Sequence, residues 1–172
     1  EGDNTRYIGP GVNKGMAAVF LNINRNKKSI CVDLKTQDGQ LIIKKLIKSA
    51  DVFVSNIRKA ALKRIGLTHS EFKKINPKII TANAVGFSSK GPYAGLPAFD
   101  DTIQAASGMA AYQKAYSSQP SYTAGATADK VTGLMLGMQI VAALFQRGKD
   151  EEGVELELPM METMVDFSLV EH

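Results

Sequence analysis

Short runs of β-branched residues alternate along the chain with segments whose apolar side chains recur every three or four positions. The apolar runs are flanked by turn residues and predict four strands, at 29–34, 51–55, 78–84 and 154–158. The helical periodicity predicts a helix that begins after Thr36, further helices over 59–64, 69–75, 100–112 and about 129–147, and a last helix from Met160. Strands that alternate with helices are typical of α/β proteins, so the pattern predicts an open, mostly parallel sheet flanked by helices.

Two loops interrupt this alternation. Residues 86–97 are rich in Gly, Pro and Ser, and residues 115–127 are rich in Ser, Pro and Tyr. Loops of this kind often carry functional groups. A chain of this length can bury roughly 70% of its unfolded surface, and no domain boundary is convincing, so we expect residues 1–172 to form one domain.

Composition supports a packed globular protein. The chain has 172 residues, of which 44% are hydrophobic and 22% charged, which excludes a disordered or fibrous protein. The longest apolar stretch, Val131 to Phe145, is shorter than the ~20 residues that cross a bilayer, so we predict no membrane span. The single cysteine, Cys31, lies in an apolar run and is expected to be buried; one unpaired cysteine favours a reducing compartment and a cytoplasmic location.

Charge is distributed unevenly. Residues 1–78 hold 16 Lys and Arg against 6 Asp and Glu, whereas residues 79–172 hold 5 against 11. A basic half suits either an anionic partner or a solvated lysine-rich face. We expect no nucleic-acid partner, because the basic residues are not interleaved with aromatic ones and no DNA- or RNA-binding motif is present. A small molecule that carries phosphate groups fits better.

The histidines do not predict a metal site. The chain has only His69 and His172, far apart in sequence and without a cysteine or carboxylate at ligand spacing. We therefore expect no metal cofactor. A serine nucleophile is equally unsupported, since the chain has no G-x-S-x-G turn.

Asp129 is the candidate catalytic residue. It ends a loop of small residues and begins the most apolar predicted helix. One interpretation is a helix N-cap, for which Asp is a favoured residue. The other is a nucleophilic carboxylate, kept ionised and oriented by the positive end of the helix dipole.

Candidate ligand-binding residues follow two predicted strands. Asn56, Ile57 and Arg58 come directly after the strand at 51–55, and Arg64 follows two helical turns later. Asp33, Leu34 and Lys35 end the strand at 29–34 in the same way. Open α/β sheets bind ligands at the carboxyl ends of their strands, so these side chains are placed to hold a nucleotide.

Taken together, these segments resemble the class III coenzyme A transferase family, which includes formyl-CoA transferase, the carnitine CoA-transferase type and α-methylacyl-CoA racemase. The resemblance runs in order along nearly the whole chain. It rests on Gly2–Arg6, Asn26–Lys35, Ala50–Asn56, Asn76-Pro77, Gly91-Pro92-Tyr93, Phe99-Asp100, Gln104–Gly108 and Ala128–Gly133.

The resemblance implies a Rossmann-like fold and a set of site residues. Asp129 matches the family's nucleophilic aspartate, and Asp100 matches a supporting acid beside it. The residues that match positions along bound coenzyme A are Val32, Asp33, Leu34, Lys35, Asn56, Ile57, Arg64 and Met160. Two departures are clear: the family's Asn-Phe-Arg-Pro-Gly is here Asn56-Ile57-Arg58-Lys59-Ala60, and a basic residue found in some members is Val85.

Family members are more than twice this length, so the resemblance implies a partial domain that lacks an N-terminal strand-helix unit and a C-terminal part. It also implies an interlocked homodimer for the full-length protein. The implied activity moves coenzyme A, bound as a substrate, between carboxylic acids through an aspartyl-CoA thioester on Asp129.

Two alternatives stay open. One is an α-methylacyl-CoA racemase on the same fold, although the racemases' Gly-His-Asp is here Ala98-Phe99-Asp100, and phenylalanine cannot exchange a proton. The other is a coenzyme A-binding fragment without activity.

Overall fold

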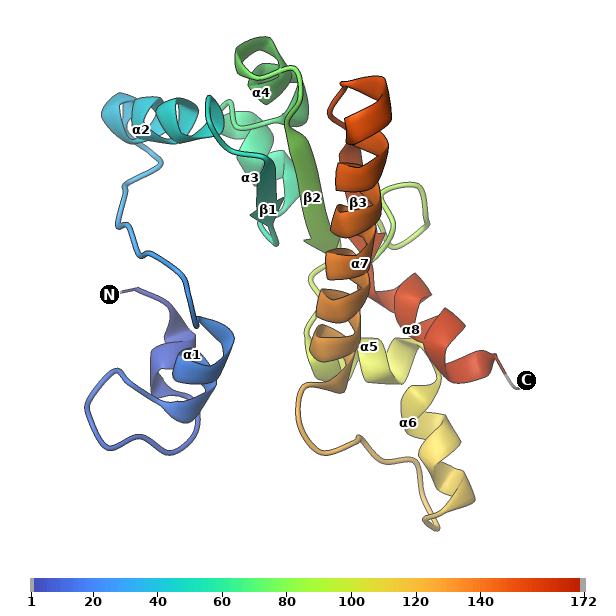
Figure 1. Cartoon of the computed structure of the whole chain (residues 1–172). Coiled ribbons are helices and arrows are strands. Elements are labelled where there is room, and N and C mark those ends of the chain that lie inside the picture. The colour runs from blue at the N-terminus through green and yellow to red at the C-terminus, as the bar shows by residue number, and fades with distance from the viewer. Residues whose placement is uncertain (1, 171–172) are drawn as a thin grey trace. The chain divides into compact units, whose positions relative to one another are not determined.

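The computed structural model describes residues 2–170 and is an α/β protein whose parallel sheet is flanked by helices. The chain divides into two compact units, Glu1–Gly39 and Gln40–His172, each of which is described by itself (Figure 1). The helices and strands, in chain order, are η1 (Asn4–Tyr7), α1 (Ala18–Ile23), α2 (Gln37–Ile47), β1 (Val52–Ser55), α3 (Lys59–Arg64), α4 (His69–Ile75), β2 (Ile80–Val85), α5 (Asp100–Ala106), α6 (Met109–Tyr112), η2 (Gln113–Ala115), α7 (Thr127–Asp150), β3 (Glu155–Pro159) and α8 (Met160–Leu169).

The first unit is a small helical piece in which η1 packs on α1. The Arg6 guanidinium lies 4.0 Å from the centre of the Phe20 ring, and the backbone N–H of Ala17 donates to the Arg6 carbonyl at 3.1 Å. Stacking of the cation on the ring joins the two short helices, neither of which is long enough to be stable alone.

The strand predicted over 29–34 does not form, and that prediction is wrong. Within the described residues no strand pairs with this segment, and a lone strand leaves its backbone groups without partners. Its end instead forms a turn, in which the Asp33 carboxylate accepts the Lys35 N–H at 2.9 Å. Cys31 is consequently exposed rather than buried.

The second unit contains a three-stranded parallel sheet in the order β1-β2-β3. The strands lie within one or two residues of the predicted runs at 51–55, 78–84 and 154–158. Ile80 and Ala82 of β2 are fully buried, as expected of a central parallel strand. Because β1 is at the edge, it is only partly buried, and Val54 is 56% exposed.

Helix α7 covers one face of this sheet (Figure 1). Ala82 of β2, Leu136 of α7 and Leu158 of β3 form the core between them. A second cluster joins four helices to the loop after β2 through Phe87, Ile103, Met109, Ala128 and Met164. The opposite face of the sheet is covered by α3 and α4, where Phe53 and Phe72 pack edge to face with ring centres 4.8 Å apart.

The helix predicted over 100–112 is interrupted. Gly108 has a φ of 84°, which a side chain-bearing residue rarely adopts, and it separates α5 from α6. The other predicted helices form, with α7 extending two or three residues beyond each predicted end. The predicted loop 86–97 is irregular. The predicted loop 115–127 is irregular except at its two ends, where η2 ends at Ala115 and α7 begins at Thr127.

Helix α7 is also the helix among the described residues that is long and apolar enough to cross a bilayer. One such helix is weak evidence for a membrane span, because a core helix of a soluble protein can have the same length and composition. Its inner face packs on β2 and β3. That no span exists therefore stays a prediction.

Candidate functional site

Asp129 lies beyond the carboxyl edge of the sheet, because α7 runs antiparallel to the strands. At its other end, the Arg147 guanidinium donates to the backbone carbonyls of Asp51 and Lys78, at 3.3 and 3.1 Å, just before β1 and β2 begin. The stretch from Asp129 to Arg147 rises roughly 27 Å, whereas six residues of β2 span roughly 20 Å. The first turn of α7 is therefore carried to the edge where parallel sheets bind ligands.

The interpretation of Asp129 as a helix N-cap is wrong. Ala126 occupies the N-cap position, and Asp129 is the third residue of α7. The backbone N–H of Asp129 is instead satisfied by the Asp100 carboxylate, whose Oδ2 accepts it at 2.9 Å. The Asp129 carboxylate is thus not used for capping, and its residue is exposed at the surface of the second unit.

Two carboxylates meet at this point of the fold. Partial burial raises the pKa of Asp129, and the negative charge of Asp100 raises it further. Both effects disfavour the ionised form, as like charges and desolvation do in general. A carboxylate that is costly to ionise is a more basic oxygen nucleophile than an ordinary aspartate, and perturbed carboxylates of this kind cluster at functional sites.

A chain of hydrogen bonds holds Asp100 in place. Its Oδ1 accepts from the Gln104 side-chain amide at 2.5 Å, one turn further along α5. Gln104 is completely buried, and its Oε1 accepts both the backbone N–H of Thr123 at 2.8 Å and the Thr123 hydroxyl at 3.1 Å. The Thr123 and Thr127 hydroxyls are 2.8 Å apart. The network therefore links α5, the loop before α7 and α7 itself.

Met160 is brought to the same region. It is the first residue of α8, directly after β3, and it packs against the cluster that contains Ala128. Ala128 is the neighbour of Asp129. The structure thus places Asp100 directly beside Asp129, and Met160 against the cluster to which the neighbour of Asp129 belongs.

The other predicted residues of the second unit lie between β1 and the end of α3. Asn56 and Ile57 follow β1 at its carboxyl end, where the Ile57 N–H donates to the Ser55 hydroxyl at 3.0 Å. Arg64 is the last residue of α3 and is exposed. Asn56 and Ile57 therefore lie at the same edge of the sheet as the first turn of α7, because the strands are parallel. Val32, Asp33, Leu34 and Lys35 belong to the first unit.

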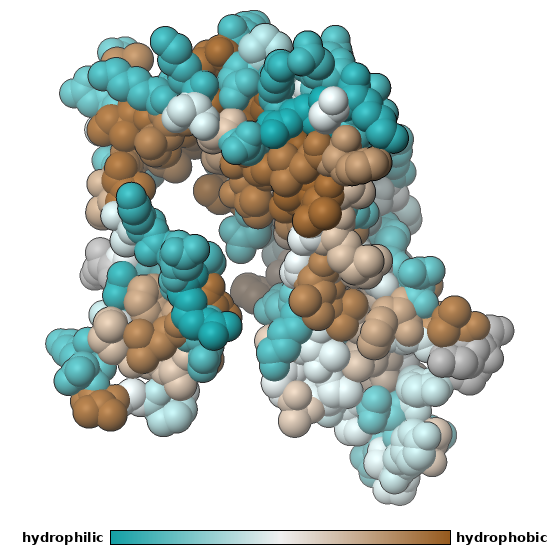
Figure 2. All heavy atoms as spheres, in the orientation of Figure 1, coloured by the Kyte–Doolittle hydropathy of each residue, from teal (hydrophilic) through white to brown (hydrophobic). Residues whose placement is uncertain are grey.

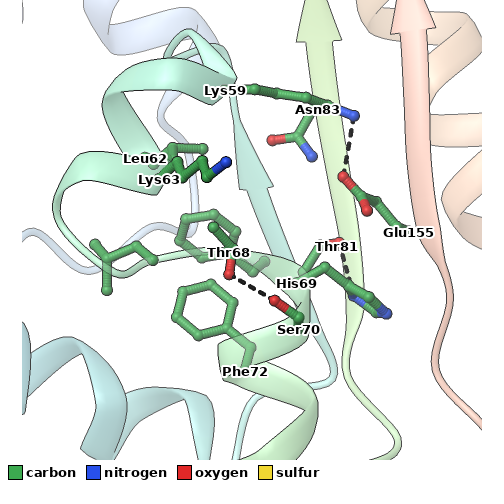
Figure 3. Close-up of a pocket in the computed structure, with 12 residues that line it drawn as sticks. Lys59, Leu62, Lys63, Thr68, His69, Ser70, Phe72, Thr81, Asn83 and Glu155 are labelled. Atoms are coloured by element: carbon green, nitrogen blue, oxygen red, sulfur yellow. Dashed lines mark hydrogen bonds and ion pairs between the residues drawn. The ribbon is translucent and has the colours of Figure 1, made fainter.

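A cavity of about 270 Å³ lies on the opposite face of the sheet from α7, between the strands and helices α3 and α4 (Figure 3). Phe53, Leu62, Leu67 and Phe72 provide its apolar lining. Its polar groups are Lys59, Lys63, Thr68, His69, Ser70, Thr81, Asn83 and Glu155. None of the residues predicted to act in catalysis or coenzyme A binding lines it.

The cavity's polar groups are mostly paired with one another. The Lys59 ammonium lies 3.0 Å from Glu155 and 2.7 Å from Glu157, and His69 Nδ1 lies 3.0 Å from the Thr81 hydroxyl. Burial lowers the pKa of His69, so the ring is neutral at pH 7. Near-neutral charge in this cavity offers little attraction to a nucleotide's phosphates.

No group of three or more His, Cys, Asp or Glu side chains suited to a metal ion occurs among residues 2–170. His172 lies outside the described residues. The absence of a metal cofactor stays a prediction.

Sequence reasoning missed the buried polar network. Gln104 stands four residues after Asp100 in a predicted helix, and that spacing puts the two side chains on one face. The spacing was therefore a usable signal for the first link. The second link, to Thr123, joins residues 19 positions apart through an irregular loop, and no local pattern indicates it.

Comparison with known proteins identifies relatives along almost the whole chain. The chain is 33% identical over 168 residues to succinate–glutarate CoA-transferase of Agrobacterium fabrum. It is 31% identical over 169 residues to formyl-CoA:oxalate CoA-transferase of Escherichia coli. The two matches cover 94% and 98% of this chain, but only 42% and 41% of the respective relatives. The chain thus spans less than half the length of these curated relatives.

Solved structures of related proteins have the same fold over nearly the whole chain. A CaiB/BaiF family protein from Brucella suis matches 99% of this chain and 46% of its own, with 32% identity and a TM-score of 0.91. The Rv3272 protein of Mycobacterium tuberculosis matches with a TM-score of 0.88 at 24% identity, which supports the fold. The family model described as CoA-transferase family III matches residues 1–171. The fold and these matches agree, and the chain belongs to CoA-transferase family III.

Proposed function

We propose that the full-length protein is a coenzyme A transferase that moves coenzyme A between carboxylic acids, with Asp129 as the nucleophile. The observation that supports this most directly is the Asp129 carboxylate, exposed at the start of α7 and not used for capping, in a chain of this family. The names of the relatives give the chemical class of the substrates: small mono- and dicarboxylic acids and their coenzyme A thioesters.

The proposed reaction is a series of balanced exchanges. An Asp129 carboxylate oxygen attacks the carbonyl carbon of an acyl-CoA thioester; the C–O bond forms, the C–S bond breaks, and coenzyme A leaves as a thiolate. The thiolate then attacks the Asp129 carbonyl carbon, which gives the aspartyl-CoA thioester and releases the first acid as a carboxylate. A second carboxylate reverses both steps. Each exchange starts and ends with an activated acyl group of similar energy, so no external energy source is needed. Binding and orientation of the reacting groups accelerate the exchanges.

In this proposal the coenzyme A chain is bound by Val32, Asp33, Leu34, Lys35, Asn56, Ile57, Arg64 and Met160, and Asp100 is the supporting acid beside the nucleophile. The proposal includes an interlocked homodimer of the full-length protein, a cytoplasmic location and no metal. It includes no nucleic-acid and no membrane partner.

Trapping of the covalent intermediate tests the assignment. The protein is incubated with succinyl-CoA, digested and examined by mass spectrometry for coenzyme A on the peptide that contains Asp129. We expect the adduct in the native protein, none in Asp129→Asn, and an unchanged amount in Asp101→Asn, the matched control on α5.

The remaining outcomes separate the alternatives. Exchange of the α-hydrogen of a 2-methylacyl-CoA for solvent deuterium, without an adduct, supports a racemase; Phe99 is 76% exposed and carries no exchangeable proton, which favours transfer. Binding of coenzyme A with neither adduct nor exchange supports a non-catalytic binding fragment.

A further inference from the structure

Gln104 is a buried, fully hydrogen-bonded side chain near Asp129, and the proposed function gives it no role. It is completely buried, and both ends of its amide are used. A buried amide is costly unless it is hydrogen-bonded, so its partners fix its position firmly. Its one contact toward the site is the 2.5 Å hydrogen bond to Asp100 Oδ1.

This contact determines where the Asp100 charge lies. With Oδ1 held by Gln104, the other oxygen, Oδ2, is directed at the backbone N–H of Asp129 at 2.9 Å. A carboxylate held by two donors on opposite oxygens cannot rotate away without losing one of them. The negative charge of Asp100 is thus fixed beside the residue that would become acylated.

The charge has a consequence for the acylated state. When the Asp129 carboxylate forms an anhydride or a thioester it loses its negative charge, so the repulsion from Asp100 disappears. An interaction that is unfavourable in the free enzyme and absent in the intermediate raises the equilibrium fraction of intermediate.

We propose that Gln104 is a positioning residue that, locked by Thr123, holds the Asp100 carboxylate beside Asp129 and thereby favours acylation of Asp129. This inference rests on the proposed function for its chemical meaning, but not for its geometry. The other charged residues on the surrounding elements are Asp101 on α5, Lys130 at the same end of α7, and Glu162 and Asp166 on α8; Arg147, Lys149 and Asp150 lie at the far end of α7. Glu162 accepts the Ser88 N–H at 3.2 Å.

The first test is the titration of Asp129 by carboxyl-carbon NMR, which requires no activity. Asp100→Asn should shift its midpoint to lower pH, because the like charge is removed. Gln104→Met keeps the size of the side chain but removes the amide, so Asp100 is free to turn toward solvent and the midpoint should shift in the same direction. Ser107→Ala is the matched control, since Ser107 is also buried in this region but lies outside the network.

The same variants are then compared for the amount of coenzyme A adduct at equilibrium. Each unit by which the Asp129 midpoint falls should lower the ratio of acylated to free protein about tenfold. If Gln104→Met does not fold, Thr123→Val decides the question, because it removes one of the two donors to Gln104 and should give a smaller shift in the same direction.

The outcomes distinguish the two proposals. An unchanged Asp129 midpoint in Asp100→Asn, or in folded Gln104→Met and Thr123→Val, overturns the positioning role. Shifted midpoints with no adduct in any protein leave the network in place and contradict the proposed transferase chemistry instead.

Discussion

At the scale of single residues, the fold makes the charged form of Asp129 unfavourable. Its pKa is raised by partial burial and by Asp100. A carboxyl with a raised pKa in the folded state destabilises the fold above that pKa, and the penalty vanishes below the unfolded pKa near 3.8. The same property that suits a nucleophile therefore lowers stability.

This predicts a pH-dependent gain in stability for Asp129→Asn. At pH 7 the variant should unfold at a higher urea concentration. Its free energy of unfolding should be higher by at most about 1 kcal/mol, because the Asp129 side chain is only partly buried and solvent screens the charge. The difference should shrink on acidification and vanish well below pH 3.8, where Asp129 is protonated in both the folded and the unfolded protein. An equal gain at both pH values would show that its cause is not the charge.

Arg64 and Lys63 make a second comparison, since they are neighbours on α3 that point differently. Lys63 lines the cavity between α3, α4 and the sheet, whereas Arg64 is exposed and is assigned here to coenzyme A. Arg64→Ala should weaken coenzyme A binding by about 1–3 kcal/mol if the guanidinium pairs with a phosphate, and Lys63→Ala should leave it unchanged. Calorimetry measures both; equal losses would contradict the assignment.

At the scale of elements, the turn between α7 and β3 depends on one close approach. A Cβ added at Gly153 would lie 2.0 Å from the backbone oxygen of Ile79, which precedes β2 and cannot move without breaking the sheet. Gly148, in the last turns of α7, has no atom within 4 Å of such a Cβ. A side chain is therefore excluded at Gly153 by the backbone of Ile79 but has room at Gly148.

We expect Gly153→Ala to lower the free energy of unfolding by about 3 kcal/mol or more, through overpacking against backbone. Gly148→Ala should raise it by about 0.5–1 kcal/mol, because alanine is the better helix former. Urea denaturation followed by circular dichroism measures both. Two variants of similar stability would refute the close contact at Gly153.

At the scale of the whole molecule, α7 has two apolar faces. One packs on the sheet, and the other is exposed within the second unit. Leu136 packs on the sheet, while Leu134, Met138, Val141 and Phe145 are each at least 66% exposed. The spacing of these four places them on one side of the helix, opposite Leu136. Figure 2 shows hydrophobic side chains gathered along α7.

The two faces should respond differently to the same substitution. Met138→Gln with Val141→Gln should reduce binding of an apolar dye such as ANS and leave the unfolding free energy within about 0.5 kcal/mol. Leu136→Gln should destabilise by about 2–5 kcal/mol, because it removes a core side chain and buries an amide. A large loss of stability in the outer double variant would show that this face is covered.

The sequence was sufficient for features that depend on local periodicity and failed where distant partners decide. The strands at 52–55 and 80–85 and the helix at 69–75 form nearly as predicted, since each pattern matches the burial it obtains. The segment 29–34 has an equally good strand pattern, but a strand needs a neighbour, and its pattern cannot supply one. For the site, the positions of Asp129, Asp100 and Met160 followed from resemblance, whereas Gln104 and Thr123 meet only through tertiary packing.

The anchoring of α7 at both ends has a consequence for how this chain tolerates insertions. Arg147 is hydrogen-bonded to the backbone just before β1 and β2, and the backbone of Asp129 is hydrogen-bonded to Asp100 of α5. The length of the helix between them therefore determines where Asp129 lies relative to the sheet. One residue added inside it would advance Asp129 by about 1.5 Å and turn it through about 100°, away from Asp100. Length changes in this helix should thus be far more damaging than equal changes in the irregular segment 116–122.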